Sequence, residues 1–102
     1  MFLIQILLPL YDNAGKRLPQ ARFKRTAEEL AAKFGGLTAY TRAPAKGLWR
    51  KPGAKTAHDD IVIYEVMSPR LAPRWWRLYR RRLEREFRQQ QIVIRAHDFR
   101  EL

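Results

Sequence analysis

The chain has 102 residues, which is enough for one domain and too few for two. Its 21 Lys and Arg residues outnumber its 10 Asp and Glu residues, which gives a formal net charge of +11, and 46% of the residues are hydrophobic, which argues against a disordered chain. The absence of Cys excludes disulfides, thiol nucleophiles, Cys-ligated zinc and iron–sulfur clusters, and it is compatible with a reducing compartment.

The first half of the chain predicts a strand, a helix and a second strand. Residues 2–9 are rich in Ile and Leu and end in Pro, which is typical of a strand. Apolar side chains then recur at helical spacing over 23–34, and the two glycines that follow are typical of a helix end. Residues 37–41 indicate a second strand, and an irregular connection rich in Pro and Gly runs over 42–58.

The second half predicts a strand over 61–67, a helix from about 73 to 90 and a strand over 91–97. The order is therefore β-α-β-β-α-β, which is the ferredoxin-like pattern of the α+β class. We expect a single domain over 1–102, with a four-stranded antiparallel sheet and two helices on one face. The usual strand order of this fold places the first strand between the third and the fourth.

The apolar N-terminus does not have the features of an export or membrane signal. No basic stretch precedes it and no small-residue cleavage site follows it. At about ten residues, the run is half the length that a membrane span needs. We therefore expect a cytoplasmic protein without a membrane span.

The helix-free face of the predicted sheet is unusually apolar. Such a face is normally in contact with water, so its side chains should be polar. Strand alternation instead places six apolar side chains there: Leu3, Leu7, Ile61, Ile63, Met67 and Val93. We expect these side chains to lie in water in a monomer, and a patch of this kind usually marks an interface. The sequence thus predicts a homodimer that packs sheet to sheet and resembles the dimeric α+β barrel superfamily.

Four polar side chains interrupt this face: Gln5, Glu65, Arg95 and His97. The topology places the first three side by side across neighbouring strands. One interpretation is a pocket between two sheets that binds a small ligand or moves a proton. The other is a buried Glu65–Arg95 pair, bridged by Gln5, that fixes the register of a dimer; it is the more common arrangement.

The predicted second helix is rich in arginine. Residues 70–88 hold eight Arg and two Glu, and six arginines share one narrow arc of a helical wheel: Arg70, Arg74, Arg77, Arg81, Arg85 and Arg88. The side chains opposite the arc should face the sheet: Trp75, Trp76, Tyr79, Leu83 and Phe87. The arc is either a solvated face, which we slightly favour, or a surface that binds nucleic acid or another polyanion. Because the core needs the Trp residues, binding to anionic lipid is less favoured.

Familiar catalytic and metal motifs are incomplete. Gly15-Lys16 lacks the rest of the Walker pattern, and Ser68 has no histidine at a defined spacing. His58 and His97 fall at opposite ends of the predicted sheet in one protomer, so we expect no metal site within a protomer; a site shared between two protomers is the weaker alternative. We also expect no cofactor. The strands also lack the aromatic platform on which RNA-recognition domains of this topology stack bases.

Three short segments resemble the F-x-x-G-[LF]-T … G-x-W signature of a family of uncharacterised small bacterial proteins: Phe34-Gly35-Gly36-Leu37-Thr38, Gly47-Leu48-Trp49-Arg50 and Gly53. The resemblance covers residues 23–96 and implies the same fold, but no known activity or catalytic residues. The present chain differs in its arginine-rich helix and in lacking the export or lipoprotein leader that the family often carries. Trp49 either caps one end of a barrel, beneath a lid formed by 42–58, or pins a long hairpin.

The sequence thus predicts a homodimer that binds a small ligand, or runs a cofactor-free reaction, between its sheets. The candidate pocket residues are Gln5, Glu65, Arg95, His97 and Trp49. Two alternatives stay open: a basic module that binds nucleic acid through the arginine-rich helix, and a structural or partner-binding dimer. No reaction or substrate follows from the sequence.

Overall fold

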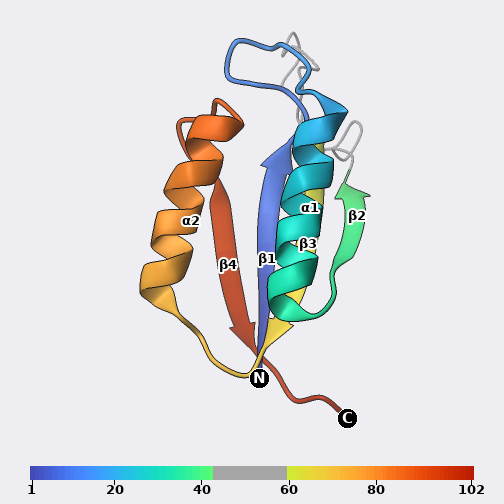
Figure 1. The fold of residues 1–102 in the computed structure, drawn as a ribbon, viewed down its shortest axis with the longest axis vertical. Helices are drawn as coiled ribbons and strands as arrows, with labels where there is room; N and C mark the ends of the chain where they lie inside the picture. Colours follow the sequence, from blue (N-terminus) through green and yellow to red (C-terminus); the bar gives the residue numbers. More distant parts are fainter. Residues whose placement is uncertain (43–59) are drawn as a thin grey trace, which may run out of the picture.

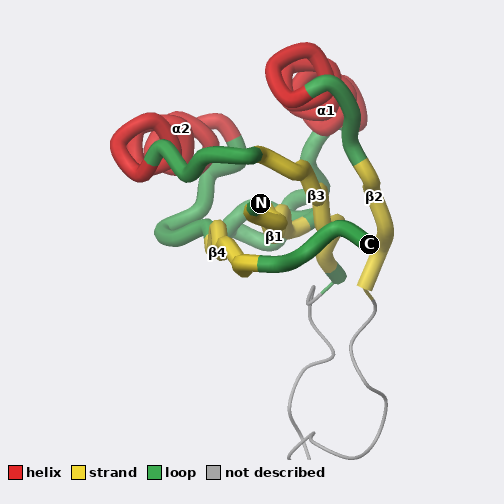
Figure 2. Tube along the Cα trace, turned by 90° about the horizontal axis from the view of Figure 1, so that it is seen from below, coloured by secondary structure: helices red, strands yellow, loops and turns green. Residues whose placement is uncertain are grey.

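The structure, a computed structural model, describes residues 1–42 and 60–102. Its elements are, in chain order, β1 (Phe2–Pro9), α1 (Gln20–Phe34), β2 (Thr38–Arg42), β3 (Ile61–Ser68), α2 (Pro73–Glu86) and β4 (Val93–Asp98). The strands form one antiparallel sheet in the order β2-β3-β1-β4 (Figure 1). Both helices lie on the same side of it (Figure 2). The predicted ferredoxin-like α+β fold is therefore confirmed, with β1 between β3 and β4.

The two helices begin and end for local reasons. Pro19 caps the start of α1 with φ −63°, and Gly35 ends the helix in the left-handed region with φ 77°. The Gly35 amide donates to the carbonyl of Ala31 at 2.9 Å, which closes the last turn. Pro73 opens α2 at its first turn, where a missing amide proton costs no helical hydrogen bond. In 1–42 and 60–102, no helix is long and apolar enough to cross a membrane.

The end of α2 differs from the prediction. The helix stops at Glu86 rather than near Gln90, and Phe87 is its C-cap. Arg88 then has φ 49°, a left-handed conformation that breaks the helical path. As a result β4 begins at Val93 rather than at Gln91.

The core lies between the sheet and the two helices. Alternate residues of β1 and β3 point into it, and so do the predicted faces of the helices. Its buried side chains include Ile4, Ile6, Leu8, Phe23, Leu30, Tyr64, Val66, Trp76, Tyr79, Leu83 and Phe87. Phe23 meets Phe87 edge to face at 5.1 Å, and Phe34 stacks on Trp76 at 5.3 Å, so aromatic contacts join α1 to α2.

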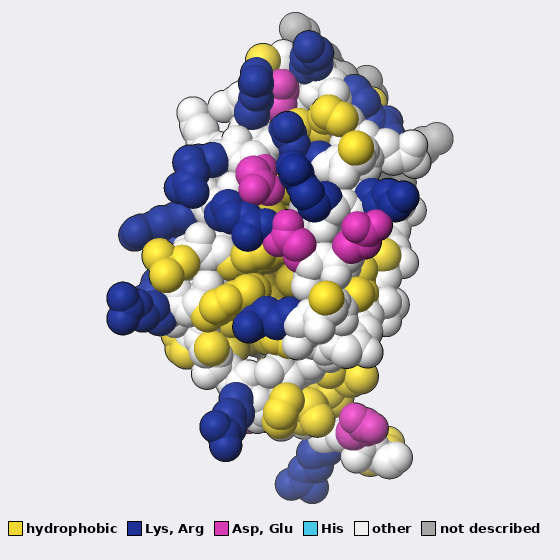
Figure 3. Space-filling model, in the orientation of Figure 1, with side chains coloured by type: hydrophobic (Ala, Val, Ile, Leu, Met, Phe, Trp, Pro, Cys, Tyr) yellow, Lys and Arg dark blue, Asp and Glu magenta, His cyan; other side chains and the backbone are white. Residues whose placement is uncertain are grey.

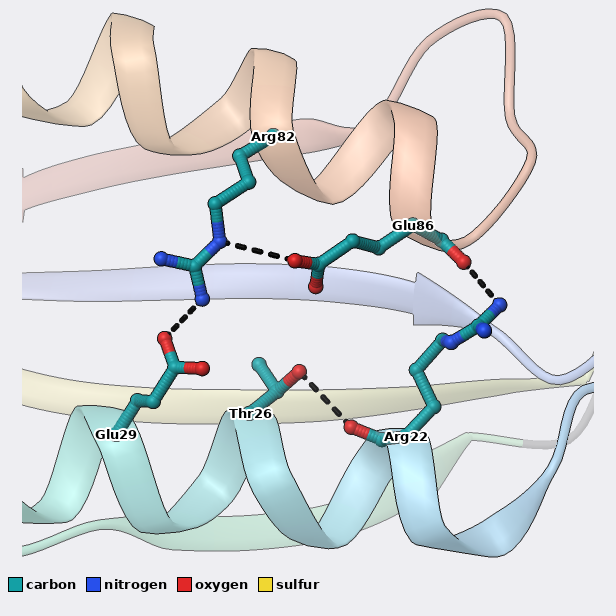
Figure 4. Close-up of polar contacts among 5 residues, drawn as sticks. All are labelled: Arg22, Thr26, Glu29, Arg82 and Glu86. Carbon is teal, nitrogen blue, oxygen red and sulfur yellow. Dashed lines mark hydrogen bonds and ion pairs between the residues drawn. The ribbon is translucent and has the colours of Figure 1, made fainter.

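A polar bridge also joins the two helices (Figure 4). The Arg82 guanidinium on α2 forms an ion pair with Glu29 on α1 and donates to Glu86 Oε1 at 3.0 Å. Arg22 on α1 donates in return to the backbone carbonyl of Glu86. Thr26 is buried beside them, and its hydroxyl donates to the Arg22 carbonyl at 3.0 Å. These contacts hold the C-terminal half of α2 against α1.

Candidate functional site

A line of hydrogen-bonded polar side chains crosses the helix-free face of the sheet. Gln5 on β1 lies opposite Glu65 on β3 and opposite Arg95 on β4. Its Nε2 donates to Glu65 Oε1 at 2.6 Å, and its Oε1 accepts from Arg95 Nε at 2.7 Å. The three side chains are therefore side by side, as the topology predicts. Gln5 acts as a bridge between the carboxylate and the guanidinium.

Tyr40 is a fourth member of this line and was not predicted from the sequence. Its hydroxyl donates to Glu65 Oε1 at 2.7 Å and accepts from Gln5 Nε2 at 3.3 Å. The hydrogen bond to Glu65 is the main reason why the pKa of Tyr40 is raised. The sequence does contain a signal for this contact. Alternation along β2 puts Tyr40 on the same face as Thr38, and Thr38 lies opposite Glu65 in the sheet.

Two groups of this polar line have hydrogen-bonding capacity left over. The Glu65 carboxylate accepts both of its hydrogen bonds at Oε1. Its Oε2 has no partner within 1–42 and 60–102. Arg95 donates through Nε, and its two terminal nitrogens have no partner among the same residues. The face thus presents one free carboxylate oxygen and one free guanidinium edge, on either side of Gln5.

The other two predicted pocket residues do not join the line. His97 lies on the same face of β4, opposite Leu3, and is exposed; the described part of the chain gives its side chain no partner. It is two positions from Arg95, or about 7 Å along the strand. Trp49, the suggested lid over 42–58 and His58 fall almost wholly within residues 43–59, which lie outside the described residues.

The surroundings of the polar line are apolar, as predicted, but not uniformly exposed. Met67 is 52% exposed and Val93 46% exposed, whereas Leu3, Leu7 and Ile61 are half-buried. The prediction that Ile63 lies in water is wrong, because this side chain is only 3% exposed. Ile63 sits on a central strand, with Leu7 and Tyr40 as its neighbours in register.

A hollow opens beside Glu65 at one end of this face. Its volume is about 370 Å³, and it lies between the sheet and the turn that joins α1 to β2. Leu3, Glu65 and Met67 line it from the sheet, and residues 34–38 line it from the turn. A small molecule can therefore reach the carboxylate from this side.

The second candidate surface is the row of six arginines that we call the arginine ridge: Arg70, Arg74, Arg77, Arg81, Arg85 and Arg88. All six are exposed, and none forms an ion pair with another described residue. Arg70 precedes α2 and Arg88 follows it, so four of the six are helical. Figure 3 shows basic side chains gathered along α2, at the left of the view.

Other arginines of α2 behave differently. Arg82 is held by Glu29 and Glu86, and Arg80 lies 3.9 Å from Glu84. The acidic groups of this region are thus used on the flanks of α2 and leave the ridge without a counter-charge from the described residues. In the same part of the chain, no group of three His, Cys, Asp or Glu side chains could hold a metal ion.

Comparisons of the chain with models of known protein families, with curated proteins and with solved structures found no match. The fold therefore rests on the structure itself. The resemblance to the family with the G-x-W signature stays a prediction.

Proposed function

We propose that the protein is a homodimer that packs sheet to sheet and binds a small ligand between its sheets, at Glu65 and Arg95. The observation that carries this proposal is the pair of free groups on an apolar face: Glu65 Oε2 and the terminal nitrogens of Arg95. Both are held in place through the same side chain, Gln5, which keeps their relative position fixed.

The occupant of the apolar face is a second copy of the chain. Packing against a second copy removes the exposed apolar side chains Met67 and Val93 from water. The free atoms of Glu65 and Arg95 lose water in such an interface, and the bound ligand supplies hydrogen bonds in its place. Electrostatics favour the same choice. Glu65 and Arg95 offset each other on this face, whereas the arginines of the ridge are exposed, on or next to α2, whose buried side chains are Trp76, Tyr79 and Leu83. Two chains of charge +11 therefore meet with least repulsion through their sheets.

The ligand class follows from the two free groups. A guanidinium edge binds a carboxylate or a phosphate through paired hydrogen bonds. A carboxylate oxygen accepts a hydrogen bond from a hydroxyl or an amine, or takes a proton from it. The ligand is therefore a small anion that also carries a hydroxyl or amino group. Where a reaction follows binding, it is a proton transfer at Glu65 that needs no cofactor.

The dimer is tested by sedimentation of the wild type and two variants over a micromolar concentration series. Met67→Glu places a charge on the apolar face and should give a monomer. Leu78→Glu is the matched control, because Leu78 is similarly exposed, at 56% against 52%, but lies on α2. It should leave the dimer intact. A wild type that stays monomeric would overturn the proposal.

The ligand site is tested by thermal shift with a panel of small hydroxy acids, amino acids and phosphate esters. A stabilising compound should lose its effect in Glu65→Gln and in Arg95→Met, and keep it in Arg77→Gln, a change on the opposite side of the molecule. A dimer that no compound stabilises would instead be a structural or partner-binding dimer, and the ligand part of the proposal would be wrong.

A further inference from the structure

We infer that the arginine ridge binds the phosphate backbone of a nucleic acid duplex, and that a hollow at the C-terminal end of α2 is its anchor point. This inference goes beyond the ligand site proposed above and does not depend on it, because the two surfaces lie on opposite sides of the molecule. It rests on four observations: unpaired charge, a strained arginine, a hollow of suitable chemistry and the shape of the ridge.

The ridge is electrostatically costly for the isolated protein. Arg77, Arg81 and Arg85 follow one another at intervals of about one helical turn, where like charges repel one another. No described acidic side chain forms an ion pair with any of these three arginines. Glu84 lines the same hollow as Arg81 and Arg85, but it is engaged by Arg80 and by the Ile92 amide. An external polyanion would supply the missing counter-charge, and arginine suits phosphate oxygens better than lysine does.

Arg88 extends the ridge beyond the helix in spite of its backbone. Its φ of 49° lies in the left-handed region, which is disfavoured for a residue with a side chain. Glycine is the usual residue at this position after a helix. The conformation is fixed on both sides: the Arg88 amide donates to Arg85 at 3.2 Å, and its carbonyl accepts from the Asn13 amide at 3.0 Å. Arginine therefore occupies a backbone position that favours glycine. A role of its side chain outside folding explains why arginine stands there.

The hollow beside Arg88 has the chemistry of a phosphate site. Its volume is about 390 Å³, and the arginines that line it are Arg81, Arg85 and Arg88. The side chains of Asn13 and Gln90 line it as well, and their amides can donate further hydrogen bonds to an oxyanion. Three arginines line this shallow, open hollow, and a guanidinium group binds phosphate oxygens through charge-assisted hydrogen bonds.

The remaining two side chains of the hollow do not oppose an anion strongly. Glu84 is already engaged, since its Oε2 accepts from the Ile92 amide at 3.0 Å and lies 3.9 Å from Arg80. Gln89 carries no charge, and its Nε2 donates to the carbonyl of Tyr11 at 2.7 Å. The net charge that faces the hollow is therefore positive.

The shape of the ridge favours a duplex over a single strand or a lipid surface. From Arg74 to Arg85 the ridge spans about 16 Å of helix axis, or roughly five base-pair steps of a duplex. The aromatic side chains of α2, which are Trp75, Trp76 and Tyr79, are buried or half-buried. The exposed face of α2 therefore offers no aromatic platform for single-stranded bases and no aromatic anchor for a membrane interface. Contacts of this kind read the backbone and not the base sequence.

The test is the anisotropy of a labelled duplex of mixed sequence, titrated with protein at low and at physiological salt. The double variants Arg81→Gln/Arg85→Gln and Arg74→Gln/Arg77→Gln form a matched pair, because each removes two ridge charges. We expect the first to weaken binding by at least about tenfold at low salt and to lower the slope of log K against log salt by about 1.8. The second double variant, Arg74→Gln/Arg77→Gln, should weaken duplex binding several-fold less than the first does.

Arg88→Gly separates binding from folding. This change should weaken duplex binding and at the same time raise the free energy of unfolding, so a loss of affinity cannot result from a damaged fold. Equal losses of duplex affinity in the two double variants would overturn the proposal that the hollow is the anchor point. Wild-type binding that disappears at physiological salt would overturn the duplex as the ligand.

The source of the phosphate is tested in the same experiment. Inorganic pyrophosphate should displace the duplex only weakly, because it fills one hollow and leaves the rest of the ridge unpaired. Tight binding of pyrophosphate without duplex binding would overturn the proposal and make the hollow a site for a free phosphate compound. Binding to vesicles of anionic phospholipid in preference to the duplex would overturn it as well.

Discussion

The Tyr40 hydroxyl donates a 2.7 Å hydrogen bond to the Glu65 carboxylate from a position that is not opposite it in the sheet. In register Tyr40 faces Ile63, and Thr38 faces Glu65, so the contact is diagonal. Diagonal neighbours are about 7–8 Å apart at the backbone, a distance that only a long side chain covers. Both hydrogen bonds to the Glu65 carboxylate are accepted by Oε1, so Oε2 has no partner among the described residues, and Glu65 lines the hollow beside β3.

Gln5→Leu should destabilise the protein more than Tyr40→Phe does. The first change removes the bridge to both Glu65 and Arg95 and should cost about 1–2 kcal/mol of unfolding free energy. The second leaves Gln5 on Glu65 Oε1 and removes only an exposed hydroxyl. Urea unfolding of the two variants and the wild type measures the difference. If Tyr40→Phe costs as much as Gln5→Leu, Gln5 is not the centre of the line.

Arg88→Gly should stabilise the fold by about 1 kcal/mol, because glycine adopts a φ of 49° without steric cost. Arg85→Gly is the natural control. It makes the same change one turn earlier, inside α2, where glycine costs about 1 kcal/mol. Thermal unfolding should therefore shift in opposite directions for the two variants. A lower melting temperature for Arg88→Gly would mean that the Arg88 side chain stabilises the fold.

The order of elements and the core were predictable from the sequence, because both depend on periodicity. Alternation placed Leu3 and Leu7 on the helix-free face, which assigns the buried residues Ile4 and Ile6 to the core face, and helical spacing placed the buried Leu83 opposite the arginine arc. The end of α2 was not predictable in this way. The apolar spacing continues to Phe87, and the left-handed turn at Arg88 carries no glycine that would mark it.

The candidate site was predictable only as far as strand order determines it. Gln5, Glu65 and Arg95 share a row once β1 is placed between β3 and β4, so their proximity follows from topology. Tyr40 joins by a diagonal contact that depends on the register of an edge strand, which the sequence does not specify. The burial of Ile63 was not predictable either, because alternation gives the face on which a side chain lies and not how deeply it is covered.

Alkaline pH should destabilise the protein through its buried tyrosines. Burial raises the pKa of Tyr64, and burial is also the main cause of the raised pKa of Tyr79. In the unfolded chain both ionise near pH 10, whereas the folded chain still holds their protons at that pH. Proton loss then favours the unfolded state, so stability is full below about pH 10 and falls as the pH rises through the folded pKa values. Urea midpoints over an alkaline pH series measure this slope.

Tyr79→Phe should reduce that alkaline slope with no loss of stability at neutral pH. The Tyr79 hydroxyl is buried and has no hydrogen-bond partner in the described residues, so its removal gives up no bond. Tyr64→Phe is the contrast, because the Tyr64 hydroxyl donates to the Phe23 carbonyl at 3.1 Å and its removal leaves that carbonyl without this donor. A neutral-pH penalty for Tyr79→Phe equal to that of Tyr64→Phe would show that a partner holds the Tyr79 hydroxyl in solution.

The Glu29–Arg82 ion pair should show a measurable coupling between α1 and α2. Both side chains are partly exposed, at 34% and 40%, so a double-mutant cycle of Glu29→Gln and Arg82→Met should give about 0.5–1 kcal/mol. The coupling should shrink at high salt, because solvent ions screen the pair. The Arg80–Glu84 pair is the control: its atoms are 3.9 Å apart and its cycle should give less. If Glu29 and Arg82 couple no more strongly than that pair, aromatic packing at Phe34 and Phe87, and not this ion pair, holds the two helices together.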